Sequence, residues 1–289
     1  MIRVANAPCS WGILEFDRTT SPATYQQVID EISLTGYVGT ERGDWGFMPT
    51  EPQTLRAEMA SRSLQLIAAF VPVALVEQAA HVDGVETAVR TARLLHDAAG
   101  PDALIVLSDD NGRIPTREQN AGRITPGDGL TDEQWTTVAA GAERVASAIK
   151  NRTGLRTVFH PHCGGYVETE SEIDELMERT DPALLGLCLD TGHIKYAGGD
   201  PLRVLTRYAP RIWHVHFKDC DDAVAAILGP ELVDRRRERE AGRGGVALVD
   251  AGVARRVVEQ VETVIEWHDE SRAGHSPGRG RVGEEEPHA

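Results

Sequence analysis

Three side chains able to bind a divalent cation lie at the ends of apolar, strand-like runs. They are His160, Asp190 and His216. Charged and imidazole groups in a buried strand are unfavourable unless a metal ion or a substrate binds them. Two imidazoles and one carboxylate suit Mn, Co, Fe, Zn or Mg and leave coordination positions for a substrate. A single aspartate there is as often a helix cap, and a single histidine more often structural, so it is their shared position that predicts a metal site.

Four further polar side chains are candidates for the chemistry of the same site. His162 and His193 are candidate ligands, or residues that orient the ligands. Lys218 shares a strand face with His216, where an ammonium can stabilise an enolate or donate to a leaving hydroxyl; a plain surface lysine is the equal alternative. Glu41 is a candidate proton-transferring group or hydroxyl acceptor, with a salt bridge to an arginine as the competing interpretation.

Strand-like and helix-like patterns alternate with a period of about 30 residues, which is typical of βα units around a parallel sheet. Capping boxes that begin helices are expected at Thr50–Gln53, Thr131–Gln134 and Thr169–Glu172. A last helix is expected over 253–267. The expected strands cover residues 2–9, 37–40, 64–71, 103–107, 155–159, 184–189, 211–217 and, as an eighth, 246–250.

Seven or eight such units without a domain linker predict one (β/α)8 TIM barrel over residues 1–268, irregular near its C-terminus, followed by a disordered tail over 269–289. A doubly wound open sheet is the alternative, but the glycine-rich phosphate fingerprint is missing after the first strand. In a barrel the candidate residues gather at the carboxyl ends of the strands. His214 lies one layer deeper than His216 on the same strand face, so we expect it to be a packed histidine.

The overall composition limits the partners. A formal charge of −15 repels phosphate backbones and anionic membrane surfaces, so neither nucleic acid nor a membrane is expected. Apolar runs are strand-sized, well short of the roughly 20 residues of a membrane span. The four cysteines contain no Cys-x-x-Cys pair and suit reduced thiols. We therefore expect a soluble cytoplasmic protein that acts on a small molecule; a homo-oligomer is compatible with the sequence.

Five short motifs stand out along the chain: Asn6–Gly12, Gly39–Glu41, His160–His162, Leu189–His193 and His214–Asp219. Together they resemble the sugar phosphate isomerase/epimerase superfamily, the xylose isomerase-like TIM barrels, and within it the inosose dehydratase-like group. Apurinic endonucleases share the barrel and the Asp-x-x-His pattern of Asp190 and His193, but the negative charge argues against a DNA substrate.

The resemblance implies a divalent metal ion, Mn, Co or Mg first and Zn or Fe as alternatives, held by groups from the last four strands. His160 stands where members commonly have a glutamate, whereas Asp190 and His216 match the motif positions directly. The fourth ligand is usually a glutamate after the eighth strand. Two candidates for it are Asp250 and Glu259, and neither has the expected context.

The resemblance also implies a reaction. It is a metal-dependent lyase reaction that removes water from a polyhydroxylated cyclic ketone resembling 2-keto-myo-inositol. A base at the rim, His193, His162 or Glu41, would take the α-proton, the metal would hold the enediolate, and Lys218 would help the β-hydroxyl leave. Two alternatives stay open: a sugar or sugar-phosphate isomerase or epimerase acting on a ketose, and a non-catalytic barrel with an incomplete metal site.

Overall fold

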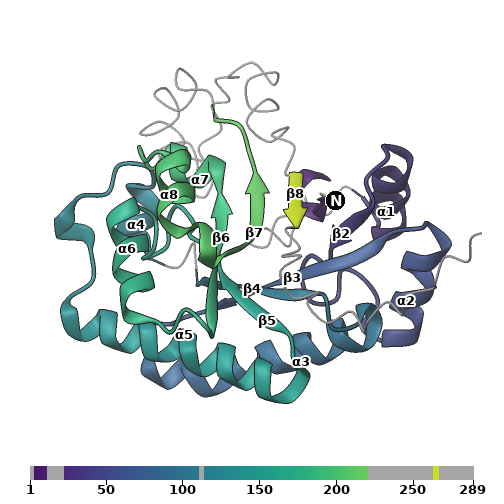
Figure 1. The fold of residues 1–289 in the computed structure, drawn as a ribbon, viewed down its shortest axis with the longest axis horizontal. Coiled ribbons are helices and arrows are strands. Elements are labelled where there is room, and N and C mark those ends of the chain that lie inside the picture. Colours follow the sequence, from purple (N-terminus) through teal and green to yellow (C-terminus); the bar gives the residue numbers. More distant parts are fainter. Residues whose placement is uncertain (1–2, 12–22, 111–113, 221–262, 267–289) are drawn as a thin grey trace, which may run out of the picture.

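The computed structural model describes residues 3–11, 23–110, 114–220 and 263–266 (Figure 1). The strands are β1 (Arg3–Asn6), β2 (Gly39–Glu41), β3 (Gln65–Val73), β4 (Leu104–Asp109), β5 (Arg156–Phe159), β6 (Leu185–Asp190), β7 (Ile212–Phe217) and β8 (Thr263–Glu266). They close into a barrel in chain order. Strands β1 to β7 pair in parallel, whereas β8 pairs antiparallel with β7 and β1. The predicted TIM barrel is confirmed, with its last strand reversed.

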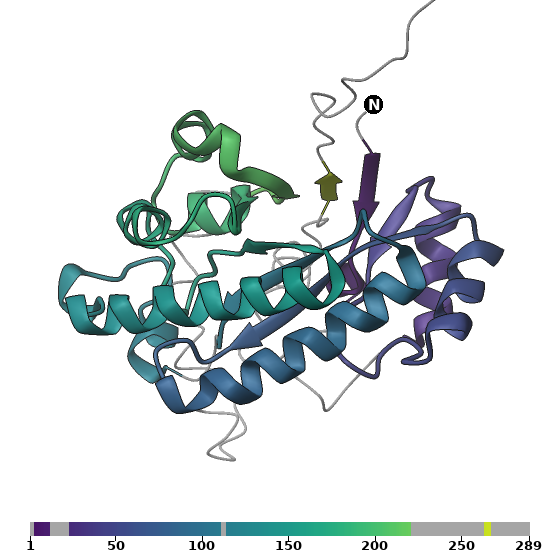
Figure 2. The same ribbon diagram turned by 60° about the horizontal axis from the view of Figure 1, so that its bottom comes forward.

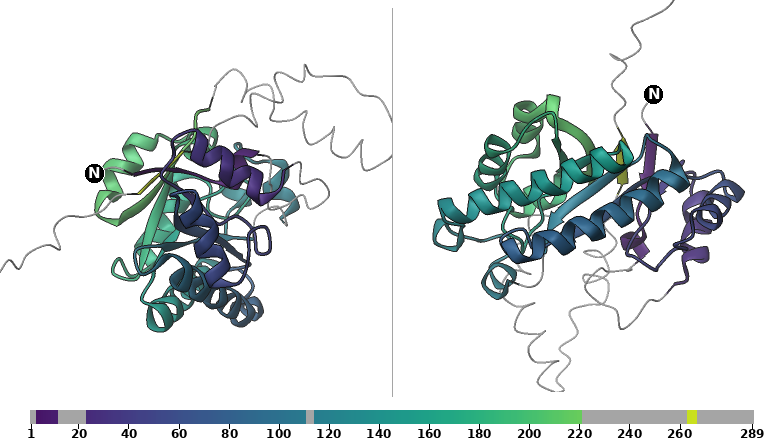
Figure 3. Two further views of the ribbon diagram at one scale, coloured as in Figure 1. Left: turned by 90° about the vertical axis from the view of Figure 1, so that its right-hand side faces the viewer. Right: turned by 90° about the horizontal axis from the view of Figure 1, so that it is seen from below.

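Helices cover the outside of the barrel. The α-helices are α1 (Tyr25–Leu34), α2 (Pro52–Ser61), α3 (His81–Ala99), α4 (Pro115–Gln119), α5 (Asp132–Thr153), α6 (Glu170–Arg179), α7 (Thr191–Tyr196) and α8 (Pro201–Tyr208). Figure 2 and the right-hand view of Figure 3 show α3 and α5 side by side across the outer face of the sheet. Among the described helices, none combines the length and apolar character that crossing a bilayer requires.

Two apolar layers hold the barrel together. The larger lies between the strands and the helices, and the smaller fills the barrel interior. Because side chains alternate along a strand, β3, β4, β5 and β6 each contribute to both layers. Most of the polar groups of the barrel interior therefore lie at the strand ends, with His214 of β7 one layer deeper. The interior layer contains Ala5, Ile67, Ala68, Leu104, Val106, Val158 and Cys188.

Two of the three predicted capping boxes form at the N-termini of helices. The predicted boxes at Thr131–Gln134 and Thr169–Glu172 are both formed and begin α5 and α6. The box predicted at Thr50–Gln53 is wrong by one residue, because the carboxylate of Glu51 caps α2 and accepts the amide of Gln53 at 3.0 Å. The positive end of the helix dipole also stabilises a negatively charged side chain at this position.

The end of the chain differs from the prediction. The helix expected over 253–267 is wrong for Thr263–Glu266, which forms β8. Thr, Val and Ile are β-branched and favour strands, and so short an apolar run cannot be assigned by its periodicity alone. The remaining predictions for this region lie outside the described residues: the strand over 246–250, Asp250, Glu259 and the tail over 269–289.

Candidate metal centre and active site

The three predicted metal ligands come together at the carboxyl end of the barrel. Asp190 is the last residue of β6 and lies in register with His216 of β7. His160 follows β5 directly, and its amide donates to the carbonyl of Leu107 on β4 at 2.7 Å. All three side chains are buried, with exposed fractions of 3% for His160, 0% for Asp190 and 4% for His216. Parallel strands thus place these groups on one rim, as predicted.

One carboxylate oxygen is the meeting point. The Oδ2 atom of Asp190 lies 3.0 Å from His160 Nε2 and 3.0 Å from Lys218 Nζ. His216 Nδ1 lies 3.5 Å from the same oxygen. The other oxygen, Oδ1, accepts the amide of His193 at 2.8 Å and caps α7. The two interpretations of this aspartate, helix cap and ligand, therefore both fit, because its two oxygens face different partners.

Glu41 lies on the opposite side of the His216 ring. Its Oε1 atom accepts hydrogen bonds from His214 Nε2 at 2.8 Å and from His216 Nε2 at 2.9 Å. This bond turns Nδ1 of His216 toward Asp190. A carboxylate that holds the far nitrogen of a metal-binding imidazole fixes its orientation and raises its basicity. His214 is fully buried and is the packed histidine expected from its layer. The proton-transfer role of Glu41 stays a prediction.

Charge determines the protonation states here. Burial alone raises the pKa of Asp190, but Lys218 and the neighbouring histidines outweigh it and hold that pKa well below the ordinary value. The pKa of Glu41 is lowered in the same way by His216 and His214. Burial opposes a charge on His216, yet Cys188 and Glu41 raise its pKa well above the usual range. Two anions therefore face an imidazolium and an ammonium.

The residues fit a divalent cation. The raised pKa of His216 and the ammonium of Lys218 place positive charge beside Asp190 and Glu41, where a divalent cation would take over that role. Within the described part of the chain, the buried Nδ1 atoms of His160 and His216 have no hydrogen-bond partner, an arrangement that calls for a missing ligand. Three groups bring their donor atoms within 4.8 Å of one another: His160–Cys188–His216, Glu41–His214–His216 and His160–Asp190–His193. The predicted ligands His160, Asp190 and His216 are divided among these groups, and none of the three groups holds all of them.

His162 and His193 form a pair beside the ligands. Their ring centroids are 3.9 Å apart, and each ring lies within 5.6 Å of the ring of His160. His162 Nδ1 donates to the carbonyl of Cys163 at 2.7 Å, which leaves Nε2 as the basic nitrogen. His193 Nδ1 instead accepts the amide of Cys163 at 3.4 Å, so its hydrogen is on Nε2.

Burial keeps both rings of this pair neutral. It lowers the pKa of His162 to about 3 and the pKa of His193 well below the ordinary value. With complementary tautomers, the pair offers one proton acceptor and one proton donor. Both are groups that the sequence assigned to the chemistry of the site.

Sequence analysis missed a clamp that fixes the loop after β5. Arg117 of α4 is fully buried and donates to Glu172 Oε1 at 2.7 Å, to its Oε2 at 2.9 Å and to the carbonyl of Gly165 at 2.7 Å. Glu168 accepts the amides of Gly122 at 2.5 Å and Gly164 at 2.8 Å. The loops after β4 and β5 are thereby joined beside His162. A single arginine in so short a helix carries no sequence signal for this role.

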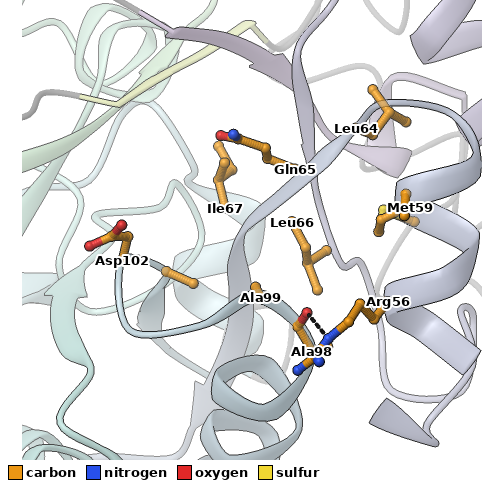
Figure 4. Close-up of a pocket in the computed structure, with 11 residues that line it drawn as sticks. Arg56, Met59, Leu64, Gln65, Leu66, Ile67, Ala98, Ala99 and Asp102 are labelled. Atoms are coloured by element: carbon orange, nitrogen blue, oxygen red, sulfur yellow. Dashed lines mark hydrogen bonds between the residues drawn. The ribbon is translucent and has the colours of Figure 1, made fainter. Parts of the chain in front are cut away.

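A hollow lies at the other end of the barrel (Figure 4). Gln65 at the start of β3 and Asp102 just before β4 mark this as the amino end of the strands. Arg56 of α2 donates to the carbonyl of Ala98 at 3.2 Å along its edge. None of the residues predicted for the site lines this hollow, so it is separate from the chemistry at the rim.

Comparison with known proteins agrees with this geometry. Residues 29–281 match the family described as xylose isomerase-like TIM barrel. The chain belongs to this family. A relative named inosose dehydratase from Geobacillus kaustophilus is 34% identical over 234 residues, covering 81% of this chain and 74% of its own length. Another so named, from Lacticaseibacillus casei, is 33% identical over 218 residues, covering 75% of this chain and 71% of its own.

Two solved structures share the fold of this chain. A probable 3-DHS dehydratase from Bacillus anthracis superposes with a TM-score of 0.56 and 14% identity, over 76% of this chain and 74% of that one. An L-ribulose 3-epimerase gives a TM-score of 0.56 and 15% identity, over 90% of this chain and 92% of that one. At such identities the likeness concerns the barrel alone.

Proposed function

We propose that this chain is a metal-dependent lyase of the inosose dehydratase type, which removes water from a polyhydroxylated cyclic ketone. The observation that carries the proposal is the convergence of His160, His216 and Lys218 on one oxygen of Asp190. The names of the relatives that match over most of the chain support the substrate class. The expected partner is a small polyol or ketose in the cytoplasm, in keeping with the negative charge and the absence of a Cys-x-x-Cys pair.

His160, Asp190 and His216 would hold the ion, which is Mn, Co or Mg in the first instance. When bound, such an ion supplies Lewis-acid polarisation of a ketone and its neighbouring hydroxyl. Glu41 keeps the ring of His216 in place through the bond to Nε2. Because these groups are buried, water is largely excluded and each charge acts more strongly on a bound substrate.

The remaining groups would move the protons. The Nε2 atom of His162 takes the proton from the α-carbon, and Nε2–H of His193 holds a substrate oxygen by a hydrogen bond. Lys218 donates a proton to the β-hydroxyl, which departs as water when the carbon–oxygen bond breaks. The product has lost one hydrogen, one hydroxyl and nothing else, and the proton on His162 returns to Lys218 through solvent.

The test is incubation of the purified protein with 2-keto-myo-inositol in deuterated water, with Mn, Co or Mg added in turn. Mass spectrometry should find a product lighter by one water. Deuterium uptake without loss of water would instead assign an isomerase or epimerase, and no change with any metal would assign a non-catalytic barrel. Lys218→Met should abolish water loss, whereas Lys150→Met, on the exposed side of α5, should not.

A further inference from the structure

Cys188 lies directly beneath the candidate metal ligands. It precedes Asp190 by two residues on β6, so both side chains point into the barrel. Its side chain is fully buried, and its thiol lies within 4.8 Å of one ring nitrogen each of His160 and His216, which lie within the same distance of each other. The thiol therefore lies close to both imidazoles at the inner end of the candidate site.

The simpler explanation is packing. Cys188 belongs to the interior layer with Val106, Val158 and Ala68, and a buried cysteine often behaves as a small apolar residue. That explanation accounts for the lower side of the thiol only. On its upper side the side chain meets His160 and His216, each of which has a buried Nδ1 atom without a hydrogen-bond partner among the described residues. The thiol and one ring nitrogen from each histidine form a set of three possible donors, and Asp190 follows two residues later on the same face of β6.

We propose that Cys188 is a fourth protein ligand of the ion, binding it through sulfur from the barrel interior. The inference rests on the proposed function, because the ion is the one held by His160, Asp190 and His216. Zinc binds thiolate at about 2.3 Å and imidazole at about 2.1 Å, so two such donors lie at most about 4.4 Å apart. The sulfur of Cys188 and one ring nitrogen each of His160 and His216 lie within 4.8 Å of one another, so these three donors need only a small side-chain adjustment to share an ion.

A sulfur ligand changes which metal the site prefers. Thiolate favours zinc, cobalt and iron, whereas magnesium is held by oxygen ligands. Binding displaces the thiol proton to solvent, so metal uptake should release a proton. The site is then selective for transition metals, and magnesium is a poor occupant. Two histidines and one aspartate alone would bind either magnesium or a transition metal, so the preference for transition metals comes from the thiolate.

Cobalt reports this ligand by its colour. The full-length protein would be titrated with Co²⁺ and its absorption spectrum recorded. A thiolate ligand gives an intense near-ultraviolet charge-transfer band that nitrogen and oxygen ligands lack, and all ligand types give weak visible bands. Wild type should show both. Cys188→Ser should keep the visible bands, lose the charge-transfer band and bind cobalt at least tenfold more weakly. Cys163→Ser removes a thiol that bonds the carbonyl of His193 instead, and should keep both bands.

The outcomes separate the two proposals. Visible bands without a charge-transfer band in wild type would overturn the role of Cys188 and leave the metal site intact. No cobalt binding at all would overturn the metal site and with it the proposed lyase. If Cys188→Ser does not fold, X-ray absorption of zinc-loaded wild type decides: one sulfur neighbour at about 2.3 Å supports the proposal, and a shell of only nitrogen and oxygen contradicts it.

Discussion

Glu41 holds His216 by a hydrogen bond of 2.9 Å between its Oε1 atom and Nε2 of the ring. The two residues are 175 positions apart in the chain. They meet because barrel closure brings the end of β2 across from β7. The same oxygen also accepts Nε2 of His214, so the carboxylate aligns two rings, one above the other. The orientation of the His216 ring, a candidate metal ligand, is thereby determined from the far side of the barrel.

Loss of this alignment should weaken metal binding. Replacement of Glu41 by Gln removes the charge that orients His216, and losses of this kind reduce metal affinity roughly 10- to 100-fold. Competition with a chromophoric chelator would measure it. Glu178→Gln, on the exposed side of α6, is the matched control and should leave the affinity unchanged. Equal affinities in both variants would show that Glu41 does not support the ligand.

Two substitutions of Asp190 should separate its structural and chemical tasks. Asparagine can still accept the amide of His193 and cap α7, so Asp190→Asn should fold while losing the metal ion. Asp190→Ala also removes the cap and should be less stable than Asp190→Asn by about 1 kcal/mol. Elemental analysis and urea unfolding give the two readouts. Metal retained at wild-type stoichiometry in Asp190→Asn would contradict its assignment as a ligand.

The clamp at Arg117 should matter more for stability than any exposed ion pair. Its guanidinium is fully buried against Glu172, and removal of one partner of a buried pair typically costs about 3–5 kcal/mol. Arg117→Met should therefore lower the free energy of unfolding by about that amount in urea. Arg207→Met, which loses exposed contacts to Asp174 and Glu178, should cost about 0–1 kcal/mol. A similar small loss in both variants would refute the assigned importance of the clamp.

Glu168 should make stability depend on pH. Burial raises the pKa of its carboxyl above the ordinary 4.5, so the folded protein holds the proton more tightly than the unfolded chain. The stabilisation is complete below pH 4.5 and is lost as pH rises through the raised value. Glu168→Gln lacks this titration. Its stability relative to wild type should therefore improve from acidic to neutral pH, as measured by thermal unfolding; a constant difference would contradict the shift.

The rim residues could be predicted because their signal is local. An apolar run that ends in a histidine or an aspartate can be recognised in the sequence. Parallel strands place their carboxyl ends on the same side of the barrel. This is how His160, Asp190 and His216 were found. The role of Cys188 gives no such signal, since a cysteine inside an apolar run is typical of packing. Its relation to the two imidazoles depends on the width and closure of the barrel.

The same limit applies to the reversed strand. Thr263–Glu266 has too few residues for its period to decide between helix and strand, and its direction depends on which neighbours it completes. Pairing with β1 and β7 satisfies the open edges of both strands at once. This extra backbone pairing depends on the nearly closed sheet formed by β1 to β7, so the strand direction could not be predicted from the four residues themselves.

The antiparallel direction of β8 also determines at which end of the barrel this strand begins. Thr263 lies opposite Phe217 and Asn6, and Glu266 lies opposite His214 and Arg3, so β8 begins at the same end of the barrel at which β7 finishes. The end of β7 and the start of β8 therefore lie at the same end of the barrel (Figure 1). Any segment that joins Cys220 to Thr263 therefore starts and ends on the side of the barrel that carries the candidate ligands His160, Asp190 and His216, whereas the amino ends of β1 to β7 lie on the other side.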